Sequence, residues 1–317
     1  DAVLSALQAL MERDVLSDGG HISQSPNYHL SFLKTLIEIR AILELHDTSL
    51  DVLNETIARM GAWLQFLCHG DGRFALFQDN LMEDALILSR VVELSAASIF
   101  SESAALPSGY AGLKKGSVCA FMRLRGTQDR SQAIGIASCE ISDGTERIIV
   151  NCGMYTGSSK SWRQAMHQPS AFSTVCLMGE MAGSGEAMPV NATQDVQDQQ
   201  DRIIAHVGYP LANQLHHERF IELGLDGNHI KGKDSIQLTE SINPSTVPAL
   251  LARFHLHPDV RCQLQKEGGI TLNLVSGAKW VFSCTYPRQV SIVESVYLGY
   301  NGKPQKTLQI IVTIPIQ

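Results

Sequence analysis

The sequence predicts an α+β multidomain protein, with a helical domain over residues 1–104 and a large antiparallel β-sandwich over residues 105–317. Three observations support this prediction. Apolar residues recur at helical spacing through the first hundred residues. The composition then changes, because Ser101 to Gly112 is rich in Ser, Ala, Gly and Pro, as in a linker. Beyond it, short apolar runs alternate with turn signals such as Ser142-Asp143-Gly144 and Asn301-Gly302, which is typical of a sandwich of antiparallel strands.

Four segments carry the helical pattern. They run from Val3 to Leu10, Phe32 to Leu43, Leu53 to Leu67 and Leu81 to Val92. The second segment has two adjacent apolar stripes, which predicts burial on two sides, as in stacked helical layers. Capping residues are expected at Thr48 or Ser49 for the third helix and at Asp79-Asn80 for the fourth.

The short apolar runs of the remaining chain predict short strands. Representative strands are Val118 to Leu124, Arg147 to Asn151, Thr271 to Val275 and Thr307 to Thr313. The stretch from Gln194 to Asp201 is polar and acidic, so we expect a solvated loop there.

The composition is that of a globular protein that does not bind nucleic acid. Hydrophobic residues make up 44% of the 317 residues and charged residues 18%, which is ordinary for a folded protein. The formal net charge of −7 argues against a nucleic-acid partner, which requires a basic face. The seven cysteines form no CxxC pair and no zinc-like spacing, so we interpret them as buried free thiols. Their odd number fits a reducing compartment better than a disulfide framework.

No apolar run is long enough to cross a bilayer, so no membrane insertion is expected. The chain begins at Asp1 and shows no basic-then-apolar signal segment. We therefore expect either that a segment has been removed or that the chain is a piece of a longer protein.

The stretch from Asp18 to His29 is the richest in reactive side chains. Ser25 is placed to cap the helix that follows, and Pro26 suits its first turn, where a missing N–H costs nothing. His21, Gln24 and Tyr28 would then cluster with His29 at the mouth of a helical layer. A helix N-terminus carries partial positive charge and free N–H donors, so it suits an anionic ligand. The alternative is a capped turn in which Tyr28 has a structural role between the two domains.

Several segments resemble the heparinase II/III-like polysaccharide lyases. The stretch from Asp18 to His29 is similar to the loop that carries the catalytic tyrosine of that family. Further similar segments follow in family order, namely His69 to Phe77, Arg147 to Gly153, Trp162 to Ala165, Arg253 to Pro258 and Glu294 to Gly299. The resemblance implies that the helical part is the end of an incomplete α/α toroid. The missing part of the toroid would carry the family's asparagine or histidine that neutralises the substrate carboxylate.

The resemblance also implies a reaction, β-elimination of a uronate-containing glycan. This reaction needs a base near the carbon alpha to the carboxylate, an acid at the leaving oxygen and donors that offset the carboxylate charge. Tyr28 is the predicted acid/base, and His21 is the predicted catalytic neighbour. The predicted substrate-binding residues are Gln24, His29, His69, Asp71, Trp162 and Arg163.

Structural alternatives exist for several of these residues. His69 and Asp71 would line the same cleft if successive helix ends face one way, but the favoured account is a Gly-flanked helix C-cap, with His69 at the negative end of the helix. Trp162 would stack on a sugar ring and Arg163 would pair with a carboxylate, or the two would anchor a loop.

The predicted β-domain departs from its relatives at the residues that bind metal. Alignment of the strand Ile136 to Asp143 puts Ser131 and Ala133 where the family has a His-x-His pair, the first a catalytic base and the second a zinc ligand. Asn151 stands at the family's metal-binding aspartate, and Phe172 at its third ligand. Methyl and phenyl groups cannot coordinate zinc, and a neutral amide is a poor ligand. We therefore expect no structural metal, no cofactor and no second catalytic histidine.

Other histidines are interpreted as structural. His255 and His257 alternate along a strand and share one face, which we interpret as a polar outer face of the sandwich. His206, His216 and His217 lie beside strand-like runs and are interpreted as surface or edge residues.

Three functions are consistent with the sequence. The first is a polysaccharide lyase acting on an acidic polysaccharide or oligosaccharide, placed in the periplasm or cell envelope by the resemblance, with the cytoplasm not excluded. The second is a catalytically impaired glycan-binding or envelope-assembly module on the same scaffold. The third is glycoside hydrolysis, which requires a pair of carboxylates that the sequence does not indicate. The sequence identifies neither the glycan nor the oligomeric state.

Overall fold

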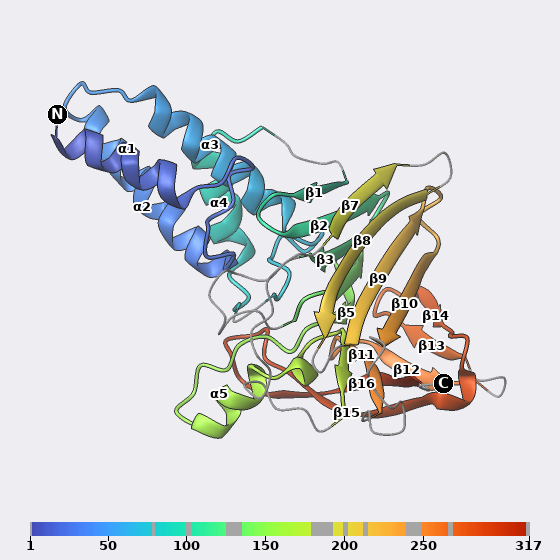
Figure 1. The fold of residues 1–317 in the computed structure, drawn as a ribbon. Coiled ribbons are helices and arrows are strands. Elements are labelled where there is room, and N and C mark those ends of the chain that lie inside the picture. The colour runs from blue at the N-terminus through green and yellow to red at the C-terminus, as the bar shows by residue number, and fades with distance from the viewer. Residues whose placement is uncertain are drawn as a thin grey trace.

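The structure is a computed structural model that combines a helical layer with strand-rich layers (Figure 1). The residues that it describes are 2–77, 80–98, 103–124, 135–178, 193–198, 202–211, 215–238, 249–265 and 269–314. Figure 1 shows the four long helices gathered at one side of strands β1 to β3, with the remaining strands extending away from them. The predicted α+β class is confirmed.

The helical layer consists of α1 (Ala2–Asp14), α2 (Pro26–Glu44), α3 (Asp51–Phe66) and α4 (Ala85–Leu94). Ser25 caps α2 as predicted, since its hydroxyl accepts a hydrogen bond from the Tyr28 N–H, and Pro26 occupies the first turn. The other caps differ from the prediction. The N-cap of α3 is Leu50, without a side-chain bond, and α4 begins later, where Asp84 accepts from the Leu86 N–H. None of the described helices is both long enough and apolar enough to span a bilayer.

The largest sheet has nine antiparallel strands, in the order β1-β2-β3-β4-β5-β11-β16-β15, with β6 paired to β11. Its strands are β1 (Ala104–Leu106), β2 (Tyr110–Lys115), β3 (Val118–Arg123), β4 (Cys139–Asp143), β5 (Glu146–Val150), β6 (Val175–Leu177), β11 (Leu250–Leu256), β15 (Val290–Tyr297) and β16 (Gln305–Ile314). A short helix, α5 (Lys160–Met166), lies between β5 and β6 in the chain.

Two smaller antiparallel sheets complete the strand-rich part. The first contains β7 (Thr193–Asp198), β8 (Arg202–Leu211), β9 (Leu215–Gly224) and β10 (Ile230–Leu238), and the second β12 (Arg261–Leu264), β13 (Ile270–Asn273) and β14 (Lys279–Phe282). One apolar core joins all three sheets, because Ile221 from β9 and Leu272 from β13 pack in the same cluster as Leu113 from β2. The predicted sandwich of antiparallel strands therefore encloses this core.

The prediction of a loop from Gln194 to Asp201 is wrong over its first five residues. Thr193–Asp198 forms β7, which pairs with β8 in a continuous antiparallel register. The ladder uses backbone N–H and C=O groups, and β7 is an edge strand, so a polar sequence does not prevent pairing. Residues 199–201 lie outside the described part of the chain.

The helical and strand-rich parts share side chains at their junction. Trp63 and Phe66 from α3 pack in one cluster with Tyr110 from β2 and Phe121 from β3. The indole N–H of Trp63 also donates to the Ser108 hydroxyl at 2.7 Å. All seven cysteines are free thiols, which agrees with the expectation from their spacing.

Candidate functional site

The loop before α2 is held in place by Asp18 and Gly19. One carboxylate oxygen of Asp18 accepts from the Gly20 N–H at 2.9 Å, and the other accepts from the Ser108 N–H at 2.8 Å. Gly19 has a φ of +87° and packs so closely on the Arg59 carbonyl that a Cβ would overlap it. Only glycine combines this conformation with this contact, so the loop is fixed against α3 and the start of β2.

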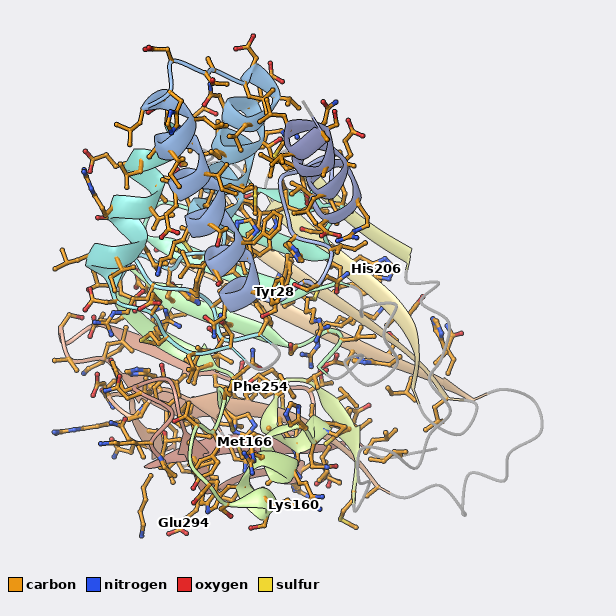
Figure 2. The ribbon with its side chains drawn as sticks, turned by 90° about the vertical axis from the view of Figure 1, so that its left-hand side faces the viewer. Tyr28, Lys160, Met166, His206, Phe254 and Glu294 are labelled. Atoms are coloured by element: carbon orange, nitrogen blue, oxygen red, sulfur yellow. The ribbon has the colours of Figure 1, made fainter. Side chains whose placement is uncertain are left out.

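Tyr28 lies at the exposed edge of the helical layer. Its side chain is 58% exposed, and Figure 2 shows it at the end of α2 that faces the strand-rich part. Its ring contacts the imidazole of His21, with ring centroids 4.8 Å apart, and the other side of His21 meets Phe32 at 5.0 Å. The structure therefore pairs the two residues predicted to be catalytic, and it leaves the Tyr28 hydroxyl accessible.

The environment of His21 defines which ring nitrogen carries a proton. Burial lowers the pKa of His21, so the ring is neutral near pH 7. The Ser23 N–H donates to Nδ1 at 3.0 Å, which places the proton of the neutral ring on Nε2. Nε2 is buried and has no hydrogen-bond partner within the described chain. The Nε2–H is therefore enclosed, and the contact of His21 with Tyr28 is made through the ring.

The structure places Gln24 and His29 inside the helical layer. Gln24 is 3% exposed with a φ of +56°, and its backbone carbonyl accepts a hydrogen bond from the Tyr110 hydroxyl. His29 is fully buried, stacks on Trp63 and lies with Nε2 3.0 Å from the Met60 carbonyl. Burial lowers the pKa of His29 to about 3. The prediction that these side chains bind substrate is corrected here, because both serve the packing of α2.

His69 is also buried, and it joins the helical part to β4. Its Nδ1 lies 2.7 Å from the Ser142 hydroxyl and its Nε2 lies 3.0 Å from Glu140. Burial lowers the pKa of His69 well below its usual value, so we describe its contact with Glu140 as a hydrogen bond from a neutral ring. Burial also raises the pKa of Glu140 to about 7. The prediction that His69 binds substrate is corrected, and so is the alternative that it caps a helix. The side chain instead links the helical part to the sheet.

Asp71 forms an ion pair with Arg147 on β5. Arg147 Nε lies 2.9 Å from Asp71 Oδ2, and Arg147 Nη2 lies 3.2 Å from Asp71 Oδ1. Burial opposes ionisation of Asp71, but the adjacent guanidinium holds the pKa of that carboxyl below its usual value. The side chain of Asp71 remains 21% exposed, and it borders a cleft.

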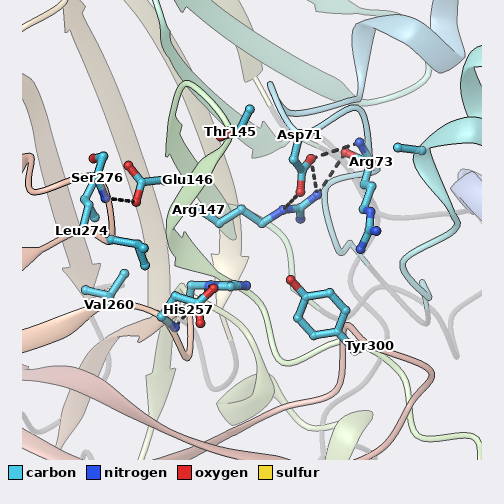
Figure 3. A pocket seen from close by; sticks show the side chains of 13 residues that line it. Asp71, Arg73, Thr145, Glu146, Arg147, His257, Val260, Leu274, Ser276 and Tyr300 are labelled. Atoms are coloured by element: carbon cyan, nitrogen blue, oxygen red, sulfur yellow. Dashed lines mark hydrogen bonds and ion pairs between the residues drawn. The ribbon is translucent and has the colours of Figure 1, made fainter.

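This cleft has a volume of about 600 Å³ and is shown in Figure 3. We call it the Arg73 cleft. Its polar lining includes Asp71, Arg73, Arg147, His257, Asp259 and Tyr300. None of the residues Asp18 to His29 lines it.

Trp162 and Arg163 lie on α5 at a different place from Tyr28. Trp162 is 36% exposed and stacks on Tyr155, with centroids 5.6 Å apart. Arg163 is exposed, and among the described residues its side chain makes only a long hydrogen bond, 3.4 Å, to the Ser158 carbonyl. In Figure 1 α5 lies at the lower left, at the level of β15, whereas α2 lies at the upper left. The sugar contacts predicted for these two residues stay a prediction.

The residues at the expected metal positions do not fit a zinc ion. Phe172 is buried among Cys152, Ala171 and Met166, and its ring also packs against Gly135. The side-chain oxygen of Asn151, Oδ1, already accepts a hydrogen bond from the Ser173 N–H at 2.8 Å. The described residues contain no group of three metal-binding side chains, and Ser131 and Ala133 lie outside them. A phenyl ring and an occupied amide cannot supply the nitrogen and carboxylate ligands that zinc requires.

A hydrogen-bond network occupies this region instead, centred on Ser173. Its hydroxyl donates to the Val150 carbonyl at 2.7 Å and accepts from the His255 N–H at 2.9 Å. Its carbonyl accepts from the Cys139 N–H and from Arg219. Ser173 therefore connects β4, β5, β9 and β11. Sequence reasoning missed it, because its neighbours come from four distant segments.

The interpretation of several histidines as surface residues is wrong. His255 is 2% exposed and His257 5% exposed, so the face that they share is turned inward. His217 is fully buried and lies 2.7 Å from Asp234, which is held in turn by Arg219. Buried and partly exposed residues alternate along β9, as expected for a strand with one covered face. The sequence did not indicate which face is covered, because the covered face also carries polar residues.

The chain is similar in sequence to a known protein family and to a protein of known name. A family model described as heparinase II/III-like, C-terminal, matches residues 101–316. The chain is 25% identical over 295 residues to FtsZ-localized protein C of Caulobacter vibrioides, a match that covers 84% of this chain and 50% of that protein.

Solved structures share the fold. The heparan sulfate lyase HepC from Pedobacter heparinus superposes with a TM-score of 0.78 at 14% identity, over 99% of this chain and 53% of that one. A heparinase III, the BT4657 gene product, superposes with a TM-score of 0.79 at 13% identity, over 99% and 52%. The chain thus spans about half the length of each of these proteins.

Proposed function

The chain belongs to the heparinase II/III-like family, and from that premise we propose that it acts as a polysaccharide lyase with Tyr28 as acid/base. Its substrate in this proposal is a uronate-containing glycan, cleaved by β-elimination. The observation that carries the proposal is the accessible phenol of Tyr28 in contact with the neutral ring of His21. The family and the fold support the lyase scaffold, whereas the reaction and its residues are our proposal.

The proposed reaction breaks a carbon–hydrogen and a carbon–oxygen bond, forms a carbon–carbon double bond and transfers a proton to the leaving oxygen. A base removes the proton alpha to the uronate carboxylate, and the released electron pair forms a carbon–carbon double bond. The bond to the leaving oxygen then breaks, and that oxygen takes up a proton. In our proposal Tyr28 exchanges protons with the substrate, as phenolate toward the carbon acid or as phenol toward the leaving oxygen. In our proposal His21 positions the phenol through its ring contact, because its Nε2 is buried.

The proposal requires a group that offsets the charge of the substrate carboxylate. Among the described residues, Arg13 is a cation whose charge acts on Tyr28, but its guanidinium is already paired with Asp14 at 2.7 Å. Because the matched proteins are about twice as long, we expect the full-length protein to supply this group from another helix. The cell envelope is the location that we propose for an enzyme of such glycans.

The test is an assay of full-length protein against a panel of acidic glycans, monitoring the ultraviolet absorbance of the unsaturated uronate product. We expect product with the wild type and none with Tyr28→Phe. Tyr286→Phe is the matched control, because Tyr286 is similarly exposed, at 45% against 58%. Equal product formation by wild type and Tyr28→Phe would remove Tyr28 from the mechanism.

A second candidate is a glycan-binding or assembly module without catalysis. It is favoured by Phe172 and Asn151, which stand where active relatives are expected to have metal ligands. The relative called FtsZ-localized protein C makes cell division one proposed setting for such a module. Calorimetry that detects glycan binding while no product forms, together with localisation of the tagged protein at FtsZ sites, would favour this function over the lyase.

A further inference from the structure

The Arg73 cleft is built by segments that the Tyr28 proposal leaves without a role. Asp71 and Arg73 follow α3, Arg147 lies on β5, His257 follows β11, and Tyr300 follows β15. These positions are far apart in the sequence and come together only in the folded chain. The cleft volume of about 600 Å³ lies within the range of small-molecule sites, roughly 300–1,000 Å³.

Arg73 supplies a cation whose hydrogen-bonding capacity is largely unused. Within the part of the chain that the structure describes, its side chain donates only to the Met82 sulfur, at 3.2 Å, and sulfur is a weak acceptor. The centre of its guanidinium lies 5.7 Å from the centroid of the Tyr300 ring, which orients it. By contrast, Arg147 is neutralised by Asp71 and Glu140. Arg73 is therefore a cation of the cleft that has no ion-pair partner among the described residues.

Tyr300 adds a neutral donor next to Arg73, and His257 adds a second one on the far side of Tyr300, with the two ring centroids 6.2 Å apart (Figure 3). Figure 3 shows the Tyr300 hydroxyl pointing into the space between Arg147 and His257. The Asp259 N–H donates to His257 Nδ1 at 3.3 Å, so the proton of the neutral ring is on Nε2. Burial lowers the pKa of His257, which keeps the ring neutral near pH 7.

The end of the cleft at His257 carries carboxylates. Asp259 Oδ2 lies 3.6 Å from His257 Nδ1, and its side chain is 66% exposed. Glu146 Oε1 accepts from the Ser276 N–H at 2.9 Å. Carboxylates are acceptors, and they suit hydroxyl groups of a ligand. One positive charge at one end and acceptors at the other match a ligand with a single anionic group beside several hydroxyls. A polyphosphate would meet too few cations and would be repelled by the carboxylates.

We propose that the Arg73 cleft is a second carbohydrate site, which binds one acidic sugar unit through its carboxylate. The carboxylate pairs with Arg73 and accepts from Tyr300. The sugar hydroxyls bind at the His257 end of the cleft, where they accept from His257 and donate to Asp259 and Glu146. The identity of the polymer rests on the proposed function, but the cleft is separate from the Tyr28 loop and is tested separately.

The experiment uses hydrogen–deuterium exchange on full-length protein, because it locates binding along the chain. The ligand is an unsulfated uronate tetrasaccharide, and its carboxyl-reduced form is the neutral control. With the acidic form we expect slower exchange in residues 257–260 and 298–302. Arg73→Gln should weaken this binding about tenfold or more, since it removes a charged hydrogen-bond donor. Arg90→Gln is the matched control, because Arg90 is exposed on α4 and pairs only with Glu93 in the described chain.

Tyr300→Phe provides a second variant, which keeps the ring under Arg73 and removes one hydroxyl. It should weaken binding about two- to tenfold. Equal protection by the carboxyl-reduced sugar, unchanged affinity of Arg73→Gln or absence of protection in these segments would each overturn the proposal. Tyr28→Phe separates the two sites. If Tyr28→Phe still forms product, the proposed lyase mechanism is wrong but the proposed cleft site is unaffected. If Tyr28→Phe abolishes product formation but the cleft segments show no protection, the cleft site is wrong and the lyase mechanism is unaffected.

Discussion

Arg147 and Asp71 form a two-point ion pair that connects β5 to the loop after α3, with Nε 2.9 Å from Oδ2 and Nη2 3.2 Å from Oδ1. Arg147 Nη2 also donates to the carbonyls of Arg73 and Phe74, at 3.0 and 2.8 Å, and Nη1 lies 3.4 Å from Glu140. One buried side chain therefore joins the helical part to the large sheet. The same contacts form one wall of the Arg73 cleft.

Arg147→Gln is expected to lower the free energy of unfolding by about 3–5 kcal/mol, because it leaves buried carboxylates without their cation. Urea unfolding followed by circular dichroism measures this change. The control is Arg90→Gln, whose partner pair is more than half exposed and which should change stability by less than about 1 kcal/mol. Equal effects of the two variants would show that the buried pair does not join the two parts.

Ser173→Ala tests the network that stands in the region of the expected metal. It leaves the Val150 carbonyl and the His255 N–H without a partner, so we expect a loss of about 2–4 kcal/mol. Ser161→Ala, at an exposed position on α5, should stay within about 0.5 kcal/mol of wild type. A small effect of Ser173→Ala would mean that water replaces the hydroxyl.

Chelation is expected to leave the thermal unfolding midpoint unchanged. The physical reason is the donor set, since the Phe172 ring cannot ligate and the Asn151 oxygen already accepts a backbone N–H. Differential scanning calorimetry with and without EDTA measures this. A midpoint that falls with EDTA and recovers with zinc would contradict it.

His29 makes stability depend on pH. The pKa of His29 is about 3 in the folded chain and near 6.5 in the unfolded chain. Between these values the imidazole is protonated in the unfolded chain but neutral in the folded chain, which favours unfolding. The stabilising contribution is complete above pH 6.5 and is lost as the pH falls toward 3. Between pH 7 and pH 5 this one residue should account for a loss of about 2 kcal/mol.

His29→Gln tests this contribution, because the amide can still donate to the Met60 carbonyl but does not titrate. Its stability, measured by urea unfolding at each pH, should decline by about 2 kcal/mol less than that of wild type over the same interval. His46→Gln controls for the loss of an exposed histidine. Parallel curves for wild type and His29→Gln would contradict the buried neutral ring.

Tyr28→Phe should separate catalysis from folding. The hydroxyl is at an exposed position, and it is the backbone N–H of Tyr28 that bonds to the Ser25 cap. Stability should therefore stay within about 0.5 kcal/mol of wild type, while product formation falls at least about a hundredfold. A large loss of stability would indicate that the tyrosine is structural.

The sequence determined the features that depend on neighbours along the chain. Helical spacing predicted the four long helices, the pair Ser25-Pro26 predicted the start of α2, and the alternating runs predicted strands at β3, β5, β13 and β16. The exposed Tyr28 and its contact with His21 are local to one loop and its helix, which explains why the sequence could indicate them. The motifs also identified the family.

Only the tertiary structure decided which faces are covered. Spacing predicts that His255 and His257 share a face, but not that the face is buried, because its cover comes from other segments. For the same reason His29 and His69 became internal links, since Met60 and Glu140 accept from them across the packed layers. The Arg73 cleft combines side chains from segments more than two hundred residues apart, and no local pattern encodes such a meeting.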